Sequence, residues 1–363
     1  MKRFDLVLLI TVIIVTLFGL LMIYEASSFI AFRDFGNKYH YLQEQSTWIV
    51  LGLGALFFFS YFDYHRFYNL ALPLLVMAIG MLMLVFIPGI GISIYGAHRW
   101  IDAGFTTIQP AEFVKLVLAI YLSAWFSKKE KERFGAFLVL VGMVMVLVMM
   151  EPDMGTAIII LSEAFIIYFL SGGALKQFFY IAPVIGVIGF ILIKLEPYRA
   201  KRLAAYLNAG DSLQTSSYHV KQILIALGSG GLTGVGLGNS IQKYAYLPEN
   251  TTDSIFAIIA EEIGFLGSLV LIALFIIIVW RGFVIAARAK DGFGRLLGGG
   301  ITAFLAMQMI INLGAQTALI PLTGVPLPFI SYGGSALIVD LCAVGILLNI
   351  ARQGNIHQGY TKL

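Results

Sequence analysis

Long apolar stretches alternate with short polar segments along almost the whole chain. Most of these stretches have close to the 20 residues that an α-helix needs to cross a hydrocarbon core about 30 Å thick. A helix also satisfies its own backbone hydrogen bonds in lipid. The pattern therefore predicts an all-α integral membrane protein, a bundle of about ten transmembrane helices forming a single domain over residues 1–363. The predicted spans are residues 6–26, 46–62, 69–88, 111–127, 135–150, 154–171, 177–196, 254–280, 294–316 and 335–352.

Composition agrees with a membrane protein and narrows the chemistry. Of the residues, 59% are hydrophobic and 12% are charged, whereas soluble domains have about 25% charged residues. The single cysteine, Cys342, lies in an apolar run, which excludes a disulfide within the chain and a cysteine-based metal site. The five histidines are scattered and show no metal-ligand spacing. A net charge of +4 gives no argument for a nucleic-acid partner.

The distribution of lysine and arginine predicts the orientation in the membrane. With the N-terminus inside the cell, more than half of the 24 Lys and Arg fall in short cytoplasmic loops and tails, as the positive-inside rule requires. Both termini are then cytoplasmic, and the long connections at 27–45, 89–110, 197–253 and 317–334 are extracytoplasmic. The apolar run from Leu6 is too long for a cleaved signal peptide and is expected to remain as the first span.

The large extracytoplasmic loop at 197–253 joins the seventh and eighth spans and is too long to be a bare connector. Within it, Thr215 to Leu227 carries apolar residues at helical spacing beside polar ones, which predicts a helix lying in the membrane interface. The loop also holds basic side chains that suit either an anionic ligand or lipid headgroups. They are Arg199, Lys201, Arg202, Lys221 and Lys243.

The segment from Pro321 to Ser335 contains three prolines and cannot form a regular helix. Non-helical backbone at membrane depth persists only where it is buried in protein or lines a wet cavity. We therefore expect this segment to enter the bundle beside the functional site.

Ionisable residues inside spans are costly and mark either a functional site or a pairing. Glu112 and Lys115 lie three residues apart on the fourth predicted span, so they share one helix face. They form either a purely structural ion pair or a site in which Lys115 meets a substrate anion. Asp153 stands where it would cap the sixth helix.

Asp253 lies where the polar loop becomes an apolar helix, so its carboxylate sits at the boundary between water and lipid. Capping of that helix would explain the residue. A general base would also fit, because the helix dipole lowers a carboxyl pKa while burial raises it. Glu261 and Glu262 lie about 12 to 14 Å further along the helix axis and are expected to pair within the bundle.

The residues around Asp253 resemble the SEDS family of bacterial cell-wall polymerases, typified by FtsW and RodA. The resemblance covers nearly the whole chain, in order. Its segments are Ser240-Ile-Gln-Lys-Tyr-Ala-Tyr-Leu-Pro-Glu249, Thr252-Asp253, Glu261-Glu262-Ile-Gly-Phe-Leu-Gly267, Arg99-Trp-Ile101, Gln109-Pro-Ala-Glu-Phe-Val-Lys115, Glu151-Pro-Asp-Met-Gly-Thr156 and Pro326-Leu-Pro-Phe-Ile-Ser-Tyr-Gly-Gly-Ser335. The chain is more similar to the division member FtsW than to the elongation member RodA. It departs from the family pattern at Ala111, Glu151, Thr251, Ser254 and Ala336.

The resemblance implies a peptidoglycan glycosyltransferase that polymerises lipid II on the outer face of the plasma membrane. Asp253 matches the essential aspartate of the family, and Glu112 and Lys115 match its paired residues on the fourth helix. Implied partners are lipid II, the undecaprenyl-pyrophosphate-linked glycan, a class B penicillin-binding protein and other division or elongation proteins, with membrane lipids around the chain. An FtsW-like member would gather at the division septum.

These observations give a hypothesis in which Asp253 is the catalytic base. Arg99, Glu112, Lys115, Arg199, Arg202, Lys243 and Ser335 are the candidate substrate-binding residues. No protein metal site is predicted, although Mg²⁺ or Mn²⁺ can bind through one or two carboxylates together with substrate phosphates. The competing interpretations are a flippase that moves lipid II across the bilayer and a scaffold that holds the transpeptidase.

Overall fold

All ten predicted spans are helices in the computed structural model. The structure describes residues 4–94, 97–104, 106–128, 133–195, 200, 202–204, 206, 215–244 and 247–354. Helices α1, α3, α10, α11 and α12 are long and apolar enough to cross a membrane, and α5, α6 and most of α7 are shorter apolar helices. The span helices are α1 Leu6–Phe35, α2 His40–Tyr61, α3 Arg66–Leu84, α4 Pro110–Phe126, α5 Phe134–Met150, α6 Met154–Leu170, α7 Leu175–Leu195, α10 Ile255–Ala287, α11 Gly292–Gln316 and α12 Gly334–Gln353.

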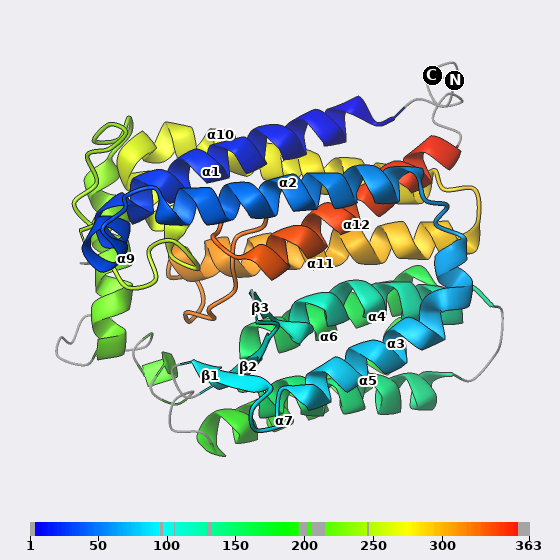
Figure 1. The fold of residues 1–363 in the computed structure, drawn as a ribbon. Helices are drawn as coiled ribbons and strands as arrows, with labels where there is room; N and C mark the ends of the chain where they lie inside the picture. Colours follow the sequence, from blue (N-terminus) through cyan, green and yellow to red (C-terminus); the bar gives the residue numbers. More distant parts are fainter. Residues whose placement is uncertain are drawn as a thin grey trace.

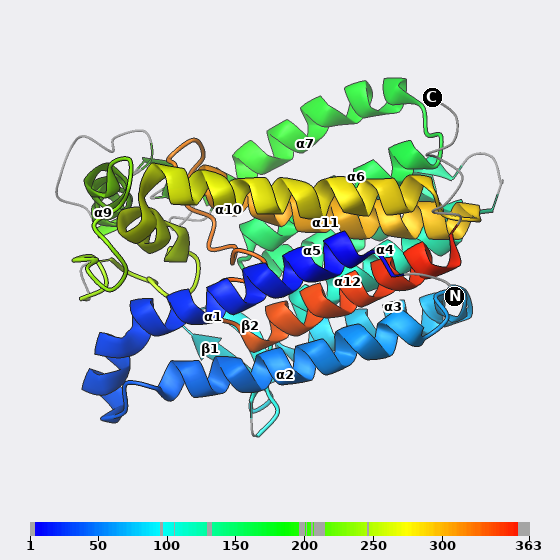
Figure 2. The same ribbon diagram turned by 90° about the horizontal axis from the view of Figure 1, so that it is seen from above.

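The span helices run side by side, and the start of α1 and the end of α12 lie at the same end of the bundle (Figure 1). Helices α11 and α12 form its centre. In each of them, 78% of the most apolar 18-residue stretch is buried. Helix α12 packs on α2, and α11 packs on α10, α6 and α4. Figure 2 shows α7 at the periphery, away from α11 and α12.

The connection expected at 27–45 is mostly helical, so its assignment as a loop was wrong. Polar residues end the apolar stretch after residue 26, but they do not end the helix, which continues to Phe35. Gly36 then adopts the left-handed conformation with φ 68°, and its N–H donates to the Phe32 carbonyl. Glycine takes this conformation without the penalty of a Cβ atom, and α2 begins at His40.

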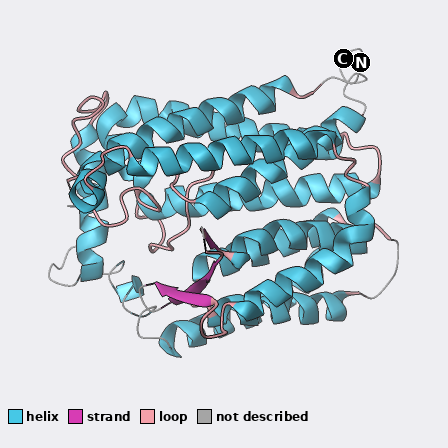
Figure 3. Cartoon of the chain, viewed as in Figure 1, coloured by secondary structure: helices cyan, strands magenta, loops and turns pink. Residues whose placement is uncertain are grey.

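A small antiparallel sheet occupies the connection between α3 and α4 and was not predicted. Its strands are β1 Gly91–Ile94, β2 Ala97–Asp102 and β3 Thr107–Ile108, in the order β1-β2-β3. Figure 3 shows it as the strand element among the helices and loops of the described chain. Strand β3 ends just before α4 begins at Pro110, so the sheet positions the start of that helix.

The helix expected at 215–227 is confirmed as α9, Thr215–Gly230. It crosses one end of the bundle, nearly perpendicular to the spans (Figure 1). Val220, Ile223 and Ala226 are buried, and the helix packs against α10. Leu224, another apolar residue of this helix, is 43% exposed. The end of the bundle that α9 crosses is called the α9 end below.

The glycine-rich segment after α9, residues 231–238, packs against a break in α10. Gly264 interrupts the helix with φ 70° and ψ −171°, which frees backbone groups on both sides. Val235 N–H donates to the Glu261 carbonyl at 3.0 Å, and Phe265 N–H donates to the Gly231 carbonyl at 2.9 Å. A Cβ atom on Gly264 would lie 2.2 Å from Gly234 N. Glycine is therefore required by both conformation and space.

Gly264→Ala is expected to lower the melting temperature of the protein in detergent. The backbone region around Gly264 is almost exclusive to glycine and costs about 1–3 kcal/mol for other residues, and the clash with Gly234 N adds to that cost. The control is Gly142→Ala in α5, where a Cβ atom meets nothing within 4 Å and alanine favours the helix. Equal melting temperatures for the two variants would contradict this account.

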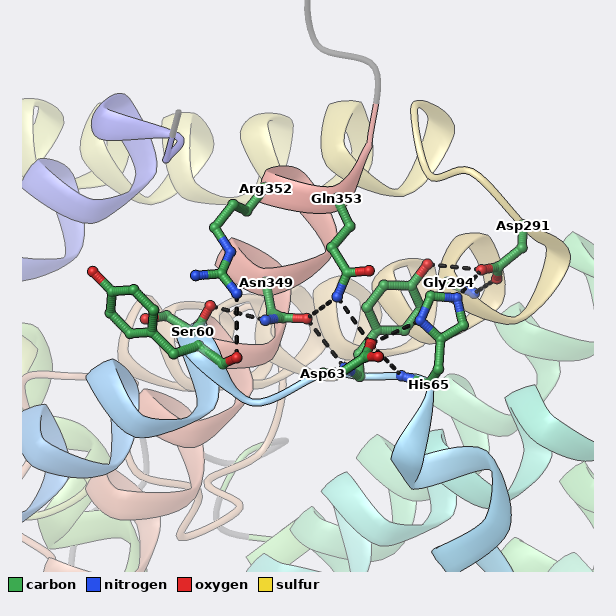
Figure 4. Close-up of polar contacts among 10 residues, drawn as sticks. Ser60, Asp63, His65, Asp291, Gly294, Asn349, Arg352 and Gln353 are labelled. Atoms are coloured by element: carbon green, nitrogen blue, oxygen red, sulfur yellow. Dashed lines mark hydrogen bonds and ion pairs between the residues drawn. The ribbon is translucent and has the colours of Figure 1, made fainter. Parts of the chain in front are cut away.

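At the end of the bundle opposite α9, a polar cluster joins three elements (Figure 4). His65, in the turn between α2 and α3, contacts Asp63 through Nδ1 and Asp291 through Nε2, both at 2.8 Å. The Gln353 amide at the end of α12 donates to Asp63 at 2.9 Å. Hydrogen bonds from Gln353 and His65 lower the pKa of Asp63 to about 2, against the opposing effect of burial. The cluster thus fixes the α2–α3 turn against the start of α11 and the end of α12.

Candidate active site

Asp253 lies at the α9 end of the bundle, in the turn immediately before α10. The cap position of α10 is Ser254, and no side chain caps the helix there, so capping does not explain Asp253. The residue is 7% exposed. A Cβ atom built on Gly324 would lie 3.9 Å from both Asp253 Oδ2 and Arg202 Nη1. The carboxylate and the guanidinium therefore converge on the same glycine.

The surroundings of Asp253 set its protonation near neutrality. Burial and the neighbouring Glu249 carboxylate raise the pKa of Asp253 to about 7, and the positive charge of Arg202 acts in the opposite direction. A general base works best when its pKa lies near the working pH. Asp253 can therefore accept a proton at neutral pH while remaining almost enclosed by protein.

The non-helical segment between α11 and α12 enters the bundle beside Asp253, as predicted. Leu327 and Ile330 are buried in it, and Figure 1 shows it between the two helices. Ser331 Oγ donates to the Thr252 carbonyl at 2.5 Å, and Tyr332 N–H donates to the Thr251 carbonyl at 2.9 Å. The segment thus fixes the backbone that carries Asp253.

Arg202 is anchored to this same segment, since its Nη1 donates to the Leu322 carbonyl at 2.9 Å. It is the member of the predicted basic group that the structure places next to Asp253. Arg199 and Lys201 lie outside the described residues. Lys243 is 4% exposed and its ammonium contacts Glu262 at 3.3 Å and Glu25 at 3.5 Å. It therefore joins α1 to α10, and Glu262 pairs within the bundle as expected.

Glu112 and Lys115 form a buried ion pair inside α4, with 2.7 Å between Lys115 Nζ and Glu112 Oε2. Lys115 also donates to Gln308 Oε1 at 2.8 Å. The positive charge of Lys115 also interacts electrostatically with two further buried carboxyl groups, Glu163 on α6 and Asp340 on α12. The pair is thus bonded into the centre of the bundle, and its direct contacts are with α11 rather than with Asp253.

Arg99 and Ser335 both lie near the start of α4. Arg99 donates to the backbone carbonyls of Glu151 and Pro152 at 3.0 and 2.6 Å. Ser335 Oγ accepts from the Gln109 N–H at 3.3 Å. These two side chains hold the sheet and the start of α4 against α6 and α12.

The connection between α5 and α6 carries two acidic residues with different surroundings. Asp153 caps α6, because its Oδ1 accepts from Thr156 N–H at 3.1 Å, which confirms the interpretation from sequence. Burial and the neighbouring Asp153 raise the pKa of Glu151 to about 9, against the effect of Arg99. At neutral pH Glu151 is therefore protonated and uncharged.

Asp253 and Glu249 are the described carboxylates that could contribute to metal binding at this site. Among the described residues, no three His, Cys, Asp or Glu side chains gather as a metal site. Asp253 and Glu249 supply two neighbouring carboxylates, which is the donor set with which Mg²⁺ commonly bridges to substrate phosphates.

A family model described as cell cycle protein, covering FtsW, RodA and SpoVE, matches residues 5–356. The chain belongs to the FtsW/RodA/SpoVE family. It is 39% identical to Stage V sporulation protein E of Bacillus subtilis (strain 168) over 96% of this chain and 97% of that protein. It is 37% identical to the probable peptidoglycan glycosyltransferase FtsW of Geobacter sulfurreducens (strain DL-1 / KN400), over 96% and 95% of the two chains.

Solved structures of the family share the fold. A chain of a peptidoglycan synthase complex that coordinates polymerization and crosslinking superposes with a TM-score of 0.80 at 25% identity, covering 96% of this chain and 98% of that chain. Rod shape determining protein RodA of Thermus thermophilus superposes with a TM-score of 0.72 at 27% identity, covering 96% and 97%. The multi-span helical bundle is thus the architecture of this family.

Proposed function

We propose that this protein is a peptidoglycan glycosyltransferase that polymerises lipid II into glycan strands. The observation that carries the proposal is the buried Asp253 carboxyl, with a pKa of about 7, beside the Arg202 guanidinium at one end of the bundle. The relatives named as FtsW glycosyltransferases support the same activity. They also favour a division role over the elongation role of RodA.

The reaction joins two lipid-linked saccharides. Asp253 accepts the proton from the 4-hydroxyl of the acceptor GlcNAc as that oxygen attacks the anomeric carbon of the lipid-linked donor chain. The new C–O bond forms as the bond to the pyrophosphate oxygen breaks, which inverts an α-linked pyrophosphate into a β-1,4 linkage. Negative charge develops on the departing pyrophosphate, and a fixed cation stabilises it.

Arg202 is the described cation closest to this chemistry. It shares the space at Gly324 with the Asp253 carboxylate, and its guanidinium fork matches the geometry of phosphate oxygens. We assign Arg199 to the same substrate anion on the basis of sequence alone. Lys243, Glu112, Lys115, Arg99 and Ser335 have their contacts within the chain, so their effect on substrate binding acts through the shape of the site.

The site faces the outside of the plasma membrane in this proposal, and both termini face the cytoplasm. The α9 end carries Asp253, whereas the start of α1 and the end of α12 lie at the opposite end (Figure 1). The excess of lysine and arginine in the short connections at that opposite end supports the orientation. An FtsW-like role would place the protein at the division septum.

A class B penicillin-binding protein is the proposed partner. Support comes from the similar chain in a complex that combines polymerization with crosslinking. A glycan strand leaving the outer face would meet a transpeptidase there, together with other division proteins and membrane lipids.

Purified protein in detergent, mixed with labelled lipid II and the partner, tests the proposal. We expect glycan strands without any membrane gradient, because detergent micelles have no second compartment. A protein that makes no strands in detergent but moves lipid II across liposome membranes would be a flippase instead.

A further inference from the structure

Three amide side chains are buried along one face of α11. Gln308, Asn312 and Gln316 follow one another at four-residue spacing, so they lie in a row that spans about 12 Å. Each is at most 1% exposed. Amides at this depth need hydrogen-bond partners, and the partners that they find all belong to the surroundings of Asp253 or to the Lys115 ion pair.

Two of the amides hold the backbone of Asp253. Asn312 Nδ2 and Gln316 Nε2 donate to the Asp253 carbonyl at 2.9 and 2.7 Å. The first backbone bond at the start of α10 runs from Ala257 N–H to the Ser254 carbonyl. The Asp253 carbonyl is therefore left outside the helix, and α11 supplies its donors.

The same row also fixes the non-helical segment that borders the site. Asn312 Nδ2 donates to the Val325 carbonyl at 2.8 Å, and Gln308 Nε2 donates to the Pro326 carbonyl at 3.3 Å. Gln308 Oε1 in turn accepts from Lys115 Nζ at 2.8 Å. The row thus connects the buried ion pair of α4, through α11, to the backbone of Asp253.

We propose that Gln308, Asn312 and Gln316 are positioning residues that set the place of the Asp253 carboxylate in the reaction. The inference rests on the proposed function, because it assigns the row a role through Asp253. It also connects the Glu112–Lys115 pair to the site, since Lys115 donates to Gln308 and Gln308 in turn donates to the Pro326 carbonyl of the segment that borders Asp253.

The test is the double variant Asn312→Leu with Gln316→Met, assayed for polymerisation of labelled lipid II. Leucine and methionine keep the approximate volumes and remove both donors to the Asp253 carbonyl. A misplacement near 1 Å costs about 10²-fold in rate, so we expect kcat to fall by about 10²-fold with KM for lipid II unchanged. Gln316→Met alone keeps the Asn312 bond and should lose about tenfold, as should Gln308→Met.

A second readout separates positioning from simple loss of stability. Once its backbone is released, Asp253 becomes more hydrated, so the ascending limb of the pH–rate profile should move to lower pH. The control is Thr302→Val, a buried change on α11 whose hydroxyl bonds only within its own helix, to the Gly298 carbonyl. It should leave kcat and the pH limb unchanged.

Asp253→Asn is measured in parallel to separate the two ideas. If Asp253→Asn is inactive but the double variant keeps the kcat and pH limb of the parent protein, the positioning role is wrong and the proposed function stands. If Asp253→Asn is fully active, the proposed function fails and the positioning role fails with it. If the double variant does not fold, Gln316→Met decides by the same two readouts.

Discussion

Asp253→Asn should reduce lipid II polymerisation by about 10² to 10⁴-fold, the usual contribution of a general base. The amide is close in shape to the carboxylate but cannot accept the proton of the acceptor hydroxyl. Asn312 and Gln316 hold its backbone carbonyl, and Thr252 Oγ1 donates to its side-chain oxygen. The substitution leaves the carbonyl bonds in place and keeps a side-chain oxygen that can accept from Thr252. The loss should therefore appear in kcat, with lipid II binding retained.

The pH dependence of the parent protein follows from the same residue. Since the pKa of Asp253 is about 7, the carboxylate form is lost below neutrality. The rate should fall about tenfold per pH unit below pH 7 and level off above it. Glu249→Gln removes a negative neighbour that raises this pKa. The fall in rate should therefore begin at a lower pH in this variant.

Stability provides a check that the inactive variant is folded. The pKa of Asp253 is raised on folding, so the folded state holds its proton more tightly than the unfolded state. Stability from this group is present below the unfolded value near 4 and is lost as the pH rises through about 7. The asparagine side chain has no carboxyl group to ionise, so Asp253→Asn avoids this loss of stability at high pH. The melting temperature in detergent at pH 8 should therefore be higher for Asp253→Asn than for the parent protein.

The matched control is Asp34→Asn, the same change at an exposed carboxylate of α1 that pairs with its neighbour Arg33. It should alter neither the rate nor the pH profile. Polymerisation at the parent rate by a folded Asp253→Asn protein would exclude Asp253 as the base.

The positions of the spans could be predicted from sequence because lipid leaves few alternatives to a helix. The length of the apolar stretches identified all ten spans, and the prolines correctly identified the non-helical segment before α12. Hydropathy did not mark the ends of helices outside the lipid, which is why α1 was assigned too short. The sheet at 91–108 was not predicted, because its strands are short and lie in the connection between two predicted spans.

The site was only partly predictable, because burial and ion pairing in the folded protein determine which of several similar side chains lies beside Asp253. Arg202 and Lys243 are both cations of the same loop, yet Arg202 borders Asp253 while Lys243 lies between Glu25 and Glu262. Nothing local to either residue distinguishes them. The amides of α11 did carry a signal, since Gln308, Asn312 and Gln316 recur every four residues within an apolar span, where uncharged polar groups need partners.

Lys115→Met should destabilise the folded protein by about 3–5 kcal/mol, the cost of removing one partner of a buried ion pair. The ammonium is the positive member of a cluster with Glu112, and it also acts on Glu163 and Asp340. Without it, the buried Glu112 carboxylate loses its partner and Gln308 Oε1 loses its donor. Thermal unfolding in detergent measures the loss.

Glu112→Gln is the informative comparison because the two members of the pair are not equivalent. After this change, Lys115 keeps its bond to Gln308 and the side-chain oxygen at position 112 remains as a second acceptor, so the melting temperature should fall much less than in Lys115→Met. The double variant should recover part of the loss, since the Glu112 charge is removed together with its partner. Equal losses in the two single variants would contradict this account, because they would mean that the remaining acceptors do not hold Lys115 and that the ion pair acts alone.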